Sequence, residues 1–415
     1  MRLKQIIPLL LFSVCTTIAV GQNIKIKKVK KHIKTLSSDE FLGRGTGEKG
    51  EELAADYISD YFKSLKLKPF GDSGTYYQNF AFTFRKTSMS DPHGEGEGIP
   101  KTGKNVVAYL DNGAEYTVII GAHYDHLGTG MMGSSRDANP EGKIHNGADD
   151  NASGTAGMME LARYYAKNGK TEGCNFIFIA FSGEELGLVG SKKFTEYEGF
   201  NATSTQCMIN MDMIGRLNDS TKKILVYGIG TSPVFGDIVQ KYIPKGLSIT
   251  IDSSGTGPTD HTSFYLKDVP VLSFFTGQHK QYHTPEDDEN LINYNGIESV
   301  LKYVANITDD VAEMQKIEFT KTVTKDQGKV SFKVTLGIMP DYTFDGPGLK
   351  IDGVTQGKPA DKAGIVAGDI ILAMGDMDLA GIMDYMKALG QYEKGQKTTV
   401  KIKRGDTLLD MEVEF

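Results

Sequence analysis

The sequence has no tryptophan, only three cysteines, and no apolar run long enough to cross a bilayer comfortably. Its 46 basic residues are outnumbered by 53 acidic ones, for a formal net charge of −7, and no basic block is large enough for a nucleic-acid footprint. Hydrophobic residues make up 39% and charged residues 24% of the 415 positions, an ordinary balance for a globular protein. These features exclude a fibrous protein, a multi-span membrane protein, a mostly disordered chain and a nucleic-acid-binding protein.

The first residues have the pattern of a secretory signal peptide. Arg2 and Lys4 precede an apolar run over 6–20, and small residues at the −3 and −1 positions fit cleavage before Gln22. We therefore expect a signal peptide at 1–21 and an exported protein, periplasmic or secreted, that is soluble and has no stable membrane anchor.

Two cysteines, Cys174 and Cys207, would remain after processing, each at the start of a predicted strand. In an oxidising compartment they could form a disulfide if the two strands are neighbours. Two buried free thiols are the equal alternative. The sequence leaves both states open.

A lysine-rich stretch over 25–34 is the one concentrated group of positive charge near the start. Its apolar residues Ile26, Val29, Ile33 and Leu36 step by 3, 4 and 3 positions, as on one face of a helix. We interpret it as an amphipathic surface helix with a solvated lysine face, rather than a membrane- or polyanion-binding segment.

The central part of the chain alternates apolar strand-like runs with helical patterns, which predicts an α/β domain: a three-layer arrangement with a mixed, mostly parallel central sheet and helices on both faces. The predicted strands are Tyr116–Ala122, Asn175–Phe181, Cys207–Met211, Lys223–Gly228 and Val269–Phe275. The predicted helices are Lys49–Leu67, Gly154–Lys167, Gly187–Tyr197, Val234–Tyr242 and Asn295–Ala312, and Gly94–Gly103 is expected to be an exposed loop.

A change of character near residue 330 predicts a second domain. Short strands, frequent glycine turns and a single helix near Met383–Leu389 indicate a small β-rich unit. We expect an α/β domain at 22–312, a polar linker at 313–329 and the β-rich domain at 330–415.

Histidines and carboxylates follow the ends of the predicted parallel strands, which is where open α/β sheets bind ligands. These residues are His123, Asp125, Asp149, Asp150, Glu184, Glu185, Asp212 and, later in the chain, His283. Taken singly, each acidic pair could be a helix cap and each histidine a hydrogen-bonded core residue. If the fold brings them together, burying so many carboxylates side by side would cost folding free energy unless a cation lay between them.

Two histidines with carboxylates and no cysteine suit zinc, with other first-row divalent ions possible. Five protein ligands around two ions, one carboxylate bridging, would leave room for a shared water of lowered pKa. The doublet Glu184-Glu185 can supply a base and a ligand side by side.

Five motifs together resemble the co-catalytic zinc aminopeptidase family, which also includes glutamate carboxypeptidases and animal-type glutaminyl cyclases. They are GAHYDHLG, NGADDNASGTAG, FSGEELGLVGS, NMDMIG and YHTPED, and the lead-in LSSDEFLGRGTGEKGEELAADYI resembles that of the bacterial members. The resemblance covers about 30–312 and implies a cofactor of two zinc ions. By position it implies that Asp149 bridges the ions, that His123 and Glu185 complete one ligand set, and that Asp212 and His283 complete the other.

The same resemblance implies three further roles. Glu184 matches the general base, Asp125 matches the carboxylate that orients the ligand histidine, and Tyr282 matches a tyrosine that polarises the scissile carbonyl in some members, with a packed aromatic as the alternative. The family's cis peptide would fall between Asp149 and Asp150.

Three other histidines are expected to lie near the centre without binding metal. The resemblance places His261 as a structural residue near the pocket. His126 and His145 flank a glycine-rich loop, and we expect loop structure or substrate contact for them rather than zinc binding.

The C-terminal region resembles a PDZ domain of the bacterial protease-associated kind. The resemblance is carried by Leu336-Gly337-Ile338, by GVTQGKPADKAGIVAGDIILAMGD and by KIKRGD. It implies that the Leu336–Ile338 turn offers backbone amides to a peptide C-terminus, with strand addition below. Regulation of the site and simple packing on the catalytic domain are the alternative roles of this domain.

We therefore expect an exported metallo-aminopeptidase that hydrolyses N-terminal residues from peptides by a metal-activated water, with Glu184 as general base. A glutaminyl-cyclase-like acyl transferase with one catalytic zinc is an alternative on the same fold. A carboxypeptidase would need a cationic clamp that the sequence does not assign. The third alternative is a peptide-binding scaffold with little activity, against which the complete ligand set argues.

Overall fold

The computed structural model describes residues 23–84, 98–130, 134–322, 334–340, 344, 346–354 and 357–415. The predicted signal peptide lies outside these residues. No helix in the described ranges is both long and apolar enough to span a membrane.

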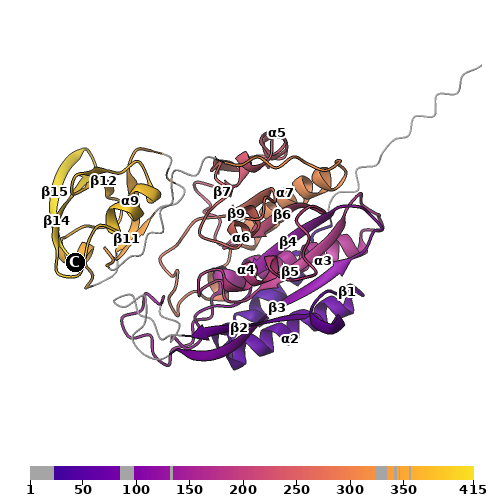
Figure 1. The fold of residues 1–415 in the computed structure, drawn as a ribbon. Coiled ribbons are helices and arrows are strands. Elements are labelled where there is room, and N and C mark those ends of the chain that lie inside the picture. The colour runs from indigo at the N-terminus through magenta and orange to yellow at the C-terminus, as the bar shows by residue number, and fades with distance from the viewer. Residues whose placement is uncertain are drawn as a thin grey trace, which may run out of the picture.

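Figure 1 shows two bodies, a large α/β domain and a smaller C-terminal β-rich domain. The helices are α1 (Ile26–Leu36), α2 (Lys49–Ser64), α3 (Gly154–Lys167), α4 (Val189–Thr195), α5 (Phe235–Lys241), α6 (His261–Tyr265), α7 (Tyr294–Ala312), α8 (Pro359–Lys362) and α9 (Ile382–Leu389). The strands are β1 (Lys68–Pro69), β2 (Tyr77–Phe84), β3 (Ile99–Leu110), β4 (Thr117–His123), β5 (Asn175–Phe181), β6 (Thr205–Met211), β7 (Lys223–Tyr227), β8 (Ser248–Ile251), β9 (Val271–Phe275), β10 (Ile338–Pro340), β11 (Leu349–Val354), β12 (Ile370–Met374), β13 (Met377–Asp378), β14 (Lys397–Arg404) and β15 (Thr407–Glu414).

The large domain is built on one mixed sheet with the strand order β1-β3-β5-β4-β6-β9-β7-β8, and β2 pairs with β3. Its centre, β5-β4-β6-β9, is parallel, while β1, β2, β3 and the β7–β9 pair are antiparallel. The predicted mixed, mostly parallel sheet is therefore confirmed. Because the four central strands run in one direction, their carboxyl ends meet at one edge of the sheet.

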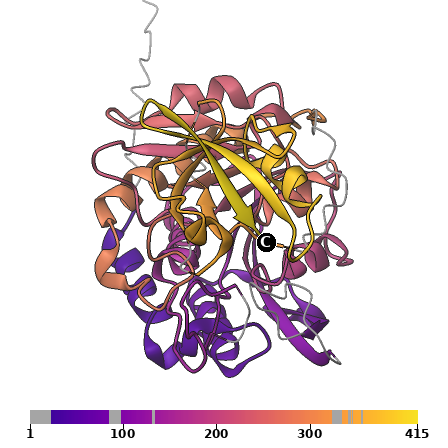
Figure 2. The same ribbon diagram turned by 90° about the vertical axis from the view of Figure 1, so that its left-hand side faces the viewer.

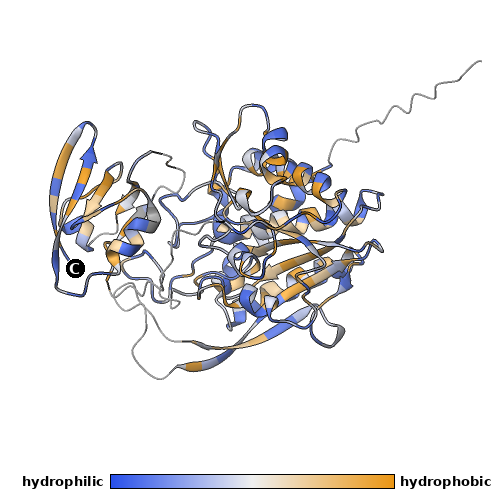
Figure 3. Cartoon of the chain, turned by 45° about the horizontal axis from the view of Figure 1, so that its top comes forward, coloured by the Kyte–Doolittle hydropathy of each residue, from blue (hydrophilic) through white to orange (hydrophobic). Residues whose placement is uncertain are grey.

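Helices cover both faces of this sheet, as the alternation of buried side chains along β4 requires. Val118 and Ile120 face the core beneath α1, α2, α3, α5 and α7, whereas Ile119 faces a second core beneath α4 and α6. In Figure 3 the central strands are hydrophobic along their length, and the outer faces of the helices are hydrophilic. The predicted three-layer architecture is confirmed.

The expected loop at Gly94–Gly103 is wrong over its described part. Residues from Ile99 onward belong to β3, which pairs with β2 along an eight-residue register that ends at Phe84. Gly103 packs against the ring of Phe80, where a Cβ would approach that ring to 2.6 Å, so here glycine permits close strand contact rather than a turn.

The C-terminal domain has its own antiparallel sheet in the order β10-β11-β12-β14-β15, with β13 paired to β12. Its core includes Leu336, Ile351, Ile371 and Val400 and is a separate cluster from the two cores of the large domain. The β14–β15 hairpin is the long element in front in Figure 2. The helix expected near Met383–Leu389 is α9, and the one-turn helix α8 is an addition to the prediction.

The chain after α7 packs back onto the large domain before it leaves it. The Ile317 N–H donates to Gln206 Oε1 (3.2 Å), and the Thr320 N–H donates to the Thr231 carbonyl (2.8 Å). Thr322 exchanges hydrogen bonds with the Tyr265 hydroxyl. The described part of the expected linker, up to Thr322, is thus held by the α/β domain.

The two cysteines are buried free thiols. Cys174 precedes β5 and Cys207 lies in β6, and β4 separates those strands. Burial raises the pKa of the Cys174 thiol to about 11, which makes it unreactive.

Candidate metal centre

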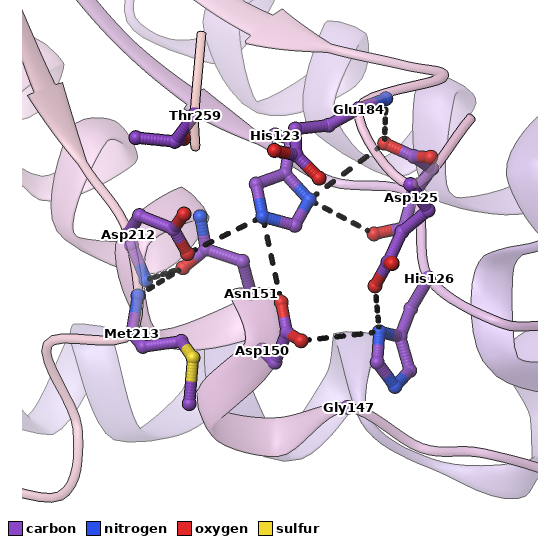
Figure 4. A network of polar contacts seen from close by, with 12 residues as sticks. His123, Asp125, His126, Gly147, Asp150, Asn151, Glu184, Asp212, Met213 and Thr259 are labelled. Atoms are coloured by element: carbon purple, nitrogen blue, oxygen red, sulfur yellow. Dashed lines mark hydrogen bonds and ion pairs between the residues drawn. The ribbon is translucent and has the colours of Figure 1, made fainter. Parts of the chain in front are cut away.

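The carboxyl edge of the parallel strands carries the predicted polar cluster. β4 ends at His123, β5 is followed by Glu184-Glu185, and β6 is followed by Asp212. The neighbouring β9 leads into the loop that carries His283. Figure 4 shows the side chains of Glu184 and Asp212 beside the ring of His123.

One group that could hold a metal ion consists of His123, Asp150 and Asp212. The Nε2 atom of His123 lies 3.3 Å from Asp212 Oδ1 and 3.4 Å from Asp150 Oδ1. Its other ring nitrogen, Nδ1, lies 3.2 Å from the Asp125 carbonyl oxygen. This partner behind the ring leaves Nε2 free to face the cluster, as is usual for metal-ligating histidines.

The other side of Asp150 faces a second group. Asp150 Oδ2 lies 3.1 Å from His283 Nε2, which is also 3.3 Å from Glu185 Oε2. His126, Asp150 and Glu185 likewise meet the geometry of a metal-binding group. His283 Nδ1 lies 3.0 Å from the Ser134 carbonyl oxygen, so each of the two histidines, His283 and His123, has a backbone carbonyl behind its ring.

Two details predicted by resemblance are therefore wrong. The carboxylate between the two groups is that of Asp150, and the cis peptide lies between Asp150 and Asn151. Asp149 points away from the cluster: its Oδ1 accepts hydrogen bonds from Ser153 (2.9 Å) and from the Gly215 N–H (2.6 Å).

The pairing of the outer ligands is also different from the prediction. His123 lies with Asp212, and Glu185 lies with His283, rather than His123 with Glu185 and Asp212 with His283. β4 lies between β5 and β6, so strand order alone does not decide which carboxylate His123 faces. The pairing follows from the course of the loops that carry Glu185 and His283, which bring these two side chains together.

The backbone leading into Asp150 turns tightly at Gly147, which has a φ of 53°. A Cβ there would lie 2.1 Å from the Asp150 carbonyl oxygen and 2.5 Å from the His126 ring. Asp287 fixes the same turn from the other side, because its Oδ2 accepts the N–H groups of Asp149 and Asp150, each at 3.0 Å.

The adjacent glutamates Glu184 and Glu185 have opposite environments. Partial withdrawal from water raises the pKa of Glu184 well above its usual range, against the opposing effect of His123 and with the support of Asp260 and Asp212. Burial alone would raise the pKa of Glu185, but His283 and His126 outweigh it and keep that pKa well below its usual range. The two neighbouring carboxyl groups therefore differ in proton affinity.

Asp125 contacts both the histidine and the glutamate loop. Its Oδ1 lies 3.7 Å from His123 Nδ1, longer than a hydrogen bond, and accepts the Glu184 N–H at 3.2 Å. Its Oδ2 accepts the Thr46 hydroxyl at 2.9 Å. The carboxylate thus fixes the backbone of Glu184 as much as it orients the ring of His123.

A cavity of about 90 Å³ opens beside the cluster. It is lined by cluster residues His123, Asp150, Glu184, Asp212 and His283 together with Met213, Tyr227, Pro258, Thr259, Phe275, Gln278 and Tyr282. Tyr282 stacks on the ring of His283 with centroids 3.8 Å apart. Its ring is therefore both a packed aromatic and a wall of the cavity.

The three histidines that were expected not to bind metal have different contacts. His126 Nδ1 lies 2.8 Å from Glu185 Oε1. His126 therefore contacts the cluster directly, whereas we expected it to support the loop or to contact substrate. His145 contacts Ser135 (2.7 Å) and the Lys143 carbonyl (2.9 Å) and supports the loop. His261 is fully buried beside Tyr227, and burial lowers its pKa to about 3.

In the predicted peptide-binding segment of the C-terminal domain, Gly337 has a positive φ of 76°. Leu336 is buried, and its carbonyl accepts the Ala360 N–H at 2.9 Å. Ile338 begins β10 opposite Val354 of β11. The Gly337 N–H donates to the Thr335 hydroxyl at 3.0 Å.

An α/β sheet that gathers imidazoles and carboxylates at the carboxyl edge of its parallel strands, with a buried glutamate and a cavity beside them, has the site architecture of a metallopeptidase. Residues 105–308 match the model of peptidase family M28, and residues 322–415 match that of the PDZ domain. The chain therefore combines an M28 peptidase domain with a C-terminal PDZ domain.

Individual relatives agree with this assignment. The alkaline phosphatase isozyme conversion protein of Escherichia coli K12 is 34% identical over 186 residues, covering 44% of this chain and 48% of that protein. A probable leucine aminopeptidase of Arthroderma otae is 25% identical over 219 residues, covering 50% and 57%. The chain thus spans about half the length of these curated relatives.

Among solved structures, BSAP, a zinc aminopeptidase from Bacillus subtilis, has a TM-score of 0.55 at 17% identity, covering 71% of this chain and 98% of that one. At this level of identity, the likeness shows a shared fold.

Proposed function

We propose that this chain is an exported aminopeptidase that uses two zinc ions to remove N-terminal residues from peptides. The observation that carries the proposal is the position of Asp150, whose two carboxylate oxygens face separate groups of ligands beside Glu184 and the cavity. Export rests on the signal-peptide pattern of 1–21.

The residues at the cluster fit zinc. Three carboxylates and two imidazoles lie within hydrogen-bonding distance of one another, an arrangement that is costly without a cation. Nitrogen and oxygen donors without sulfur suit a catalytic rather than a structural zinc site. We assign His123 and Asp212 to one ion, Glu185 and His283 to the other, and Asp150 to both.

His126 is assigned a supporting role instead of direct coordination. Its Nδ1 is at hydrogen-bond distance from Glu185 Oε1 (2.8 Å), whereas it lies 3.8 Å from Asp150 Oδ2. His283 reaches both of these carboxylates with one nitrogen. The proposed place of His126 is therefore behind Glu185, holding the orientation of that ligand.

Zinc at such a centre lowers the pKa of water and polarises a carbonyl group. Within the protein, Glu184 accepts the proton of the attacking water and returns it to the leaving amine nitrogen. Its raised pKa makes it a better proton acceptor, and the bond from its N–H to Asp125 fixes its place. Tyr282 lies at the cavity wall, where its hydroxyl can approach the scissile carbonyl.

The cavity favours one uncharged side chain at the N-terminus of the substrate. Met213, Tyr227, Phe275 and Tyr282 supply apolar surface, and no lysine or arginine lines the cavity among the described residues. A carboxypeptidase would need such a cation for the substrate carboxylate. The relative from Arthroderma otae carries the name leucine aminopeptidase, which agrees with an apolar preference.

The test compares a leucine-initiated peptide with its N-acetylated twin, using zinc-loaded protein and mass spectrometry of the products. Release of leucine from the free peptide alone is the expected result. Cleavage of the acetylated peptide would contradict an aminopeptidase. Cyclisation of an N-terminal glutamine, with one zinc per chain and no released residue, would indicate an acyl transferase instead.

Glu184→Gln provides the matched control, since it keeps the size of the side chain but removes the base. We expect kcat to fall by about 100-fold or more, as for loss of a general base. Zinc content should stay unchanged because Glu184 is not assigned as a ligand.

A further inference from the structure

The segment Leu42–Gly45, which precedes the part of the chain matched by the M28 model, lies between the two loops that carry the metal-centre residues. The Gly128 N–H donates to the Gly43 carbonyl at 2.9 Å, and the His126 N–H donates to the Arg44 carbonyl at 3.3 Å. Gly45 forms an isolated parallel bridge with His126.

This segment has a backbone that few sequences adopt. Leu42, Gly43 and Arg44 all have positive φ values, 49°, 67° and 53°. A Cβ on Gly43 would lie 2.3 Å from the Gly128 carbonyl oxygen and 2.6 Å from that of His145. The glycine thus lets the chain enter the narrow space between the loop after β4 and the loop before α3.

The side chain of Arg44 connects the same two loops. Its Nε donates to the Tyr124 carbonyl (2.7 Å), and its terminal nitrogens donate to the carbonyls of Asn146 (2.7 Å) and Gly147 (3.0 Å). A further bond reaches the carbonyl of Leu36 at 2.5 Å, at the end of α1. The guanidinium has no exposed surface, so these carbonyls replace its hydration.

The bonded carbonyls adjoin the proposed zinc ligands. Tyr124 follows His123 directly, and Gly147 lies three residues before Asp150. A guanidinium fork that bonds both loops fixes the distance between the two ligands. Burial lowers the pKa of Arg44 to about 10, while Asp150 and Asp125 oppose that shift, so the group stays charged at neutral pH.

We propose that Arg44 is a positioning residue of the metal centre, which holds the loops of His123 and Asp150 at the separation that two-ion binding needs. The inference rests on the proposed function for its kinetic consequences, but its consequence for zinc affinity does not depend on the substrate. This positioning role requires the planar guanidinium with its five N–H donors, because the single ammonium group of lysine cannot donate to four carbonyls in these directions.

The experiment compares Arg44→Lys with Arg163→Lys in the full-length protein. Arg163 is a matched control, because it also bridges separate parts of the chain, donating to Glu160 and to the Asn23 carbonyl, but it lies nine residues into α3 from the metal centre. Zinc affinity is measured by competition with a chelator, kcat and KM are measured at saturating zinc, and unfolding is followed without metal.

We expect Arg44→Lys to bind zinc about 10- to 100-fold more weakly, the range found for groups that orient metal ligands. At saturating zinc its kcat should fall while KM changes little. Arg163→Lys should lower stability but leave zinc affinity and kcat unchanged. If Arg44→Lys is destabilised yet binds zinc as tightly as the parent, Arg44 is merely structural and the proposal is wrong.

A measurement on the unaltered protein covers the case in which Arg44→Lys does not fold. The amides of His126 and Gly128 should resist hydrogen exchange in the zinc-free protein nearly as well as core strands do. Fast exchange that stops only on adding zinc would show that the metal, not the segment with Arg44, orders the loop. An inactive parent protein that still shows the predicted zinc affinities would overturn the proposed function alone.

Discussion

Asp149 and Asp150 are adjacent, identical in type and different in environment. The carboxylate of Asp149 accepts hydrogen bonds from Ser153 and Gly215, whereas that of Asp150 lies between His123 and His283. These contacts are the basis for proposing that Asp150 bridges two ions and that Asp149 supports the loop.

Asparagine at each position separates these roles. Asp150→Asn removes a charge that both ions would share, and we expect loss of the second zinc and of nearly all activity. Asp149→Asn keeps the Oδ1 acceptor, so we expect zinc affinity and activity to fall by about tenfold or less. This is the low end of the range for groups that orient metal ligands. Zinc content by elemental analysis, with kcat on an aminoacyl anilide, measures both, and equal losses in the two variants would contradict the assignment.

The residue types at the centre could be predicted from the sequence, but their arrangement could not. His123, Glu185, Asp212 and His283 meet at one edge of the sheet as expected. Which member of the Asp149-Asp150 doublet faces the cluster depends on the turn at Gly147. The pairing of the side chains depends on the course of the loops that follow the strands, which sequence periodicity does not contain. The contacts of His126 and Arg44 depend on the same loops.

At the scale of elements, α1 shows how a buried titratable group ties a helix to its neighbour. His32 lies on the buried face of α1, with its Nδ1 2.7 Å from the Tyr57 hydroxyl and its ring against Tyr61 of α2. Burial, followed by the nearby Lys28 and Lys31, lowers its pKa to about 4.

This shift predicts a pH dependence of stability. The stabilisation is fully present above the unfolded-state pKa of 6.5 and is lost as pH falls toward 4, because only the unfolded chain then binds the proton. The full difference corresponds to about 3 kcal/mol. His32→Gln should therefore remove part of the stability loss between pH 7 and pH 4.5 in urea unfolding of the zinc-free protein. Lys34→Gln, also on α1, is the control, and parallel pH profiles for parent and His32→Gln would contradict the prediction.

The strongly patterned elements were predictable because burial on one or both faces gives a clear period. The bounds of β5 and α3 agree with those expected, and α1, α2 and α7 lie within a few residues of theirs. β2 and β3 were missed, since glycines and a proline near the start of β3 suggest a loop when the paired strand is not known. The short helices α6 and α8 have too few residues to show a period.

At the scale of the whole molecule, the two domains have separate cores, and the cores of the large domain include residues beyond position 312. Ile317 is buried in the large core and Phe319 packs against Tyr265. We propose that the peptidase unit extends from residue 22 to Thr322 and that the PDZ unit is the remainder, with its turn at Leu336–Ile338 binding a peptide C-terminus.

Two truncations test this boundary. A chain ending at Thr322 should keep the hydrolysis of a small aminoacyl anilide within about twofold of the full-length protein, since no core residue of the large domain is lost. A chain ending at Ala312 loses the buried side chain of Ile317. Removal of a large buried side chain lowers the free energy of unfolding by about 2–4 kcal/mol, so this chain should unfold at a lower temperature. If the chain that ends at Thr322 is folded but inactive, the PDZ domain takes part in catalysis. Equal melting temperatures for the two products would refute the revised boundary.

The central claim is that Asp150 lies between two zinc ions, and anomalous diffraction at the zinc edge from a zinc-soaked crystal tests it most directly. We predict two peaks about 3.5–4 Å apart, as in two-metal sites, with Asp150 between them. His123 and Asp212 should coordinate one ion, and Glu185 and His283 the other. A single peak, or two peaks bridged by Asp149, would contradict the account.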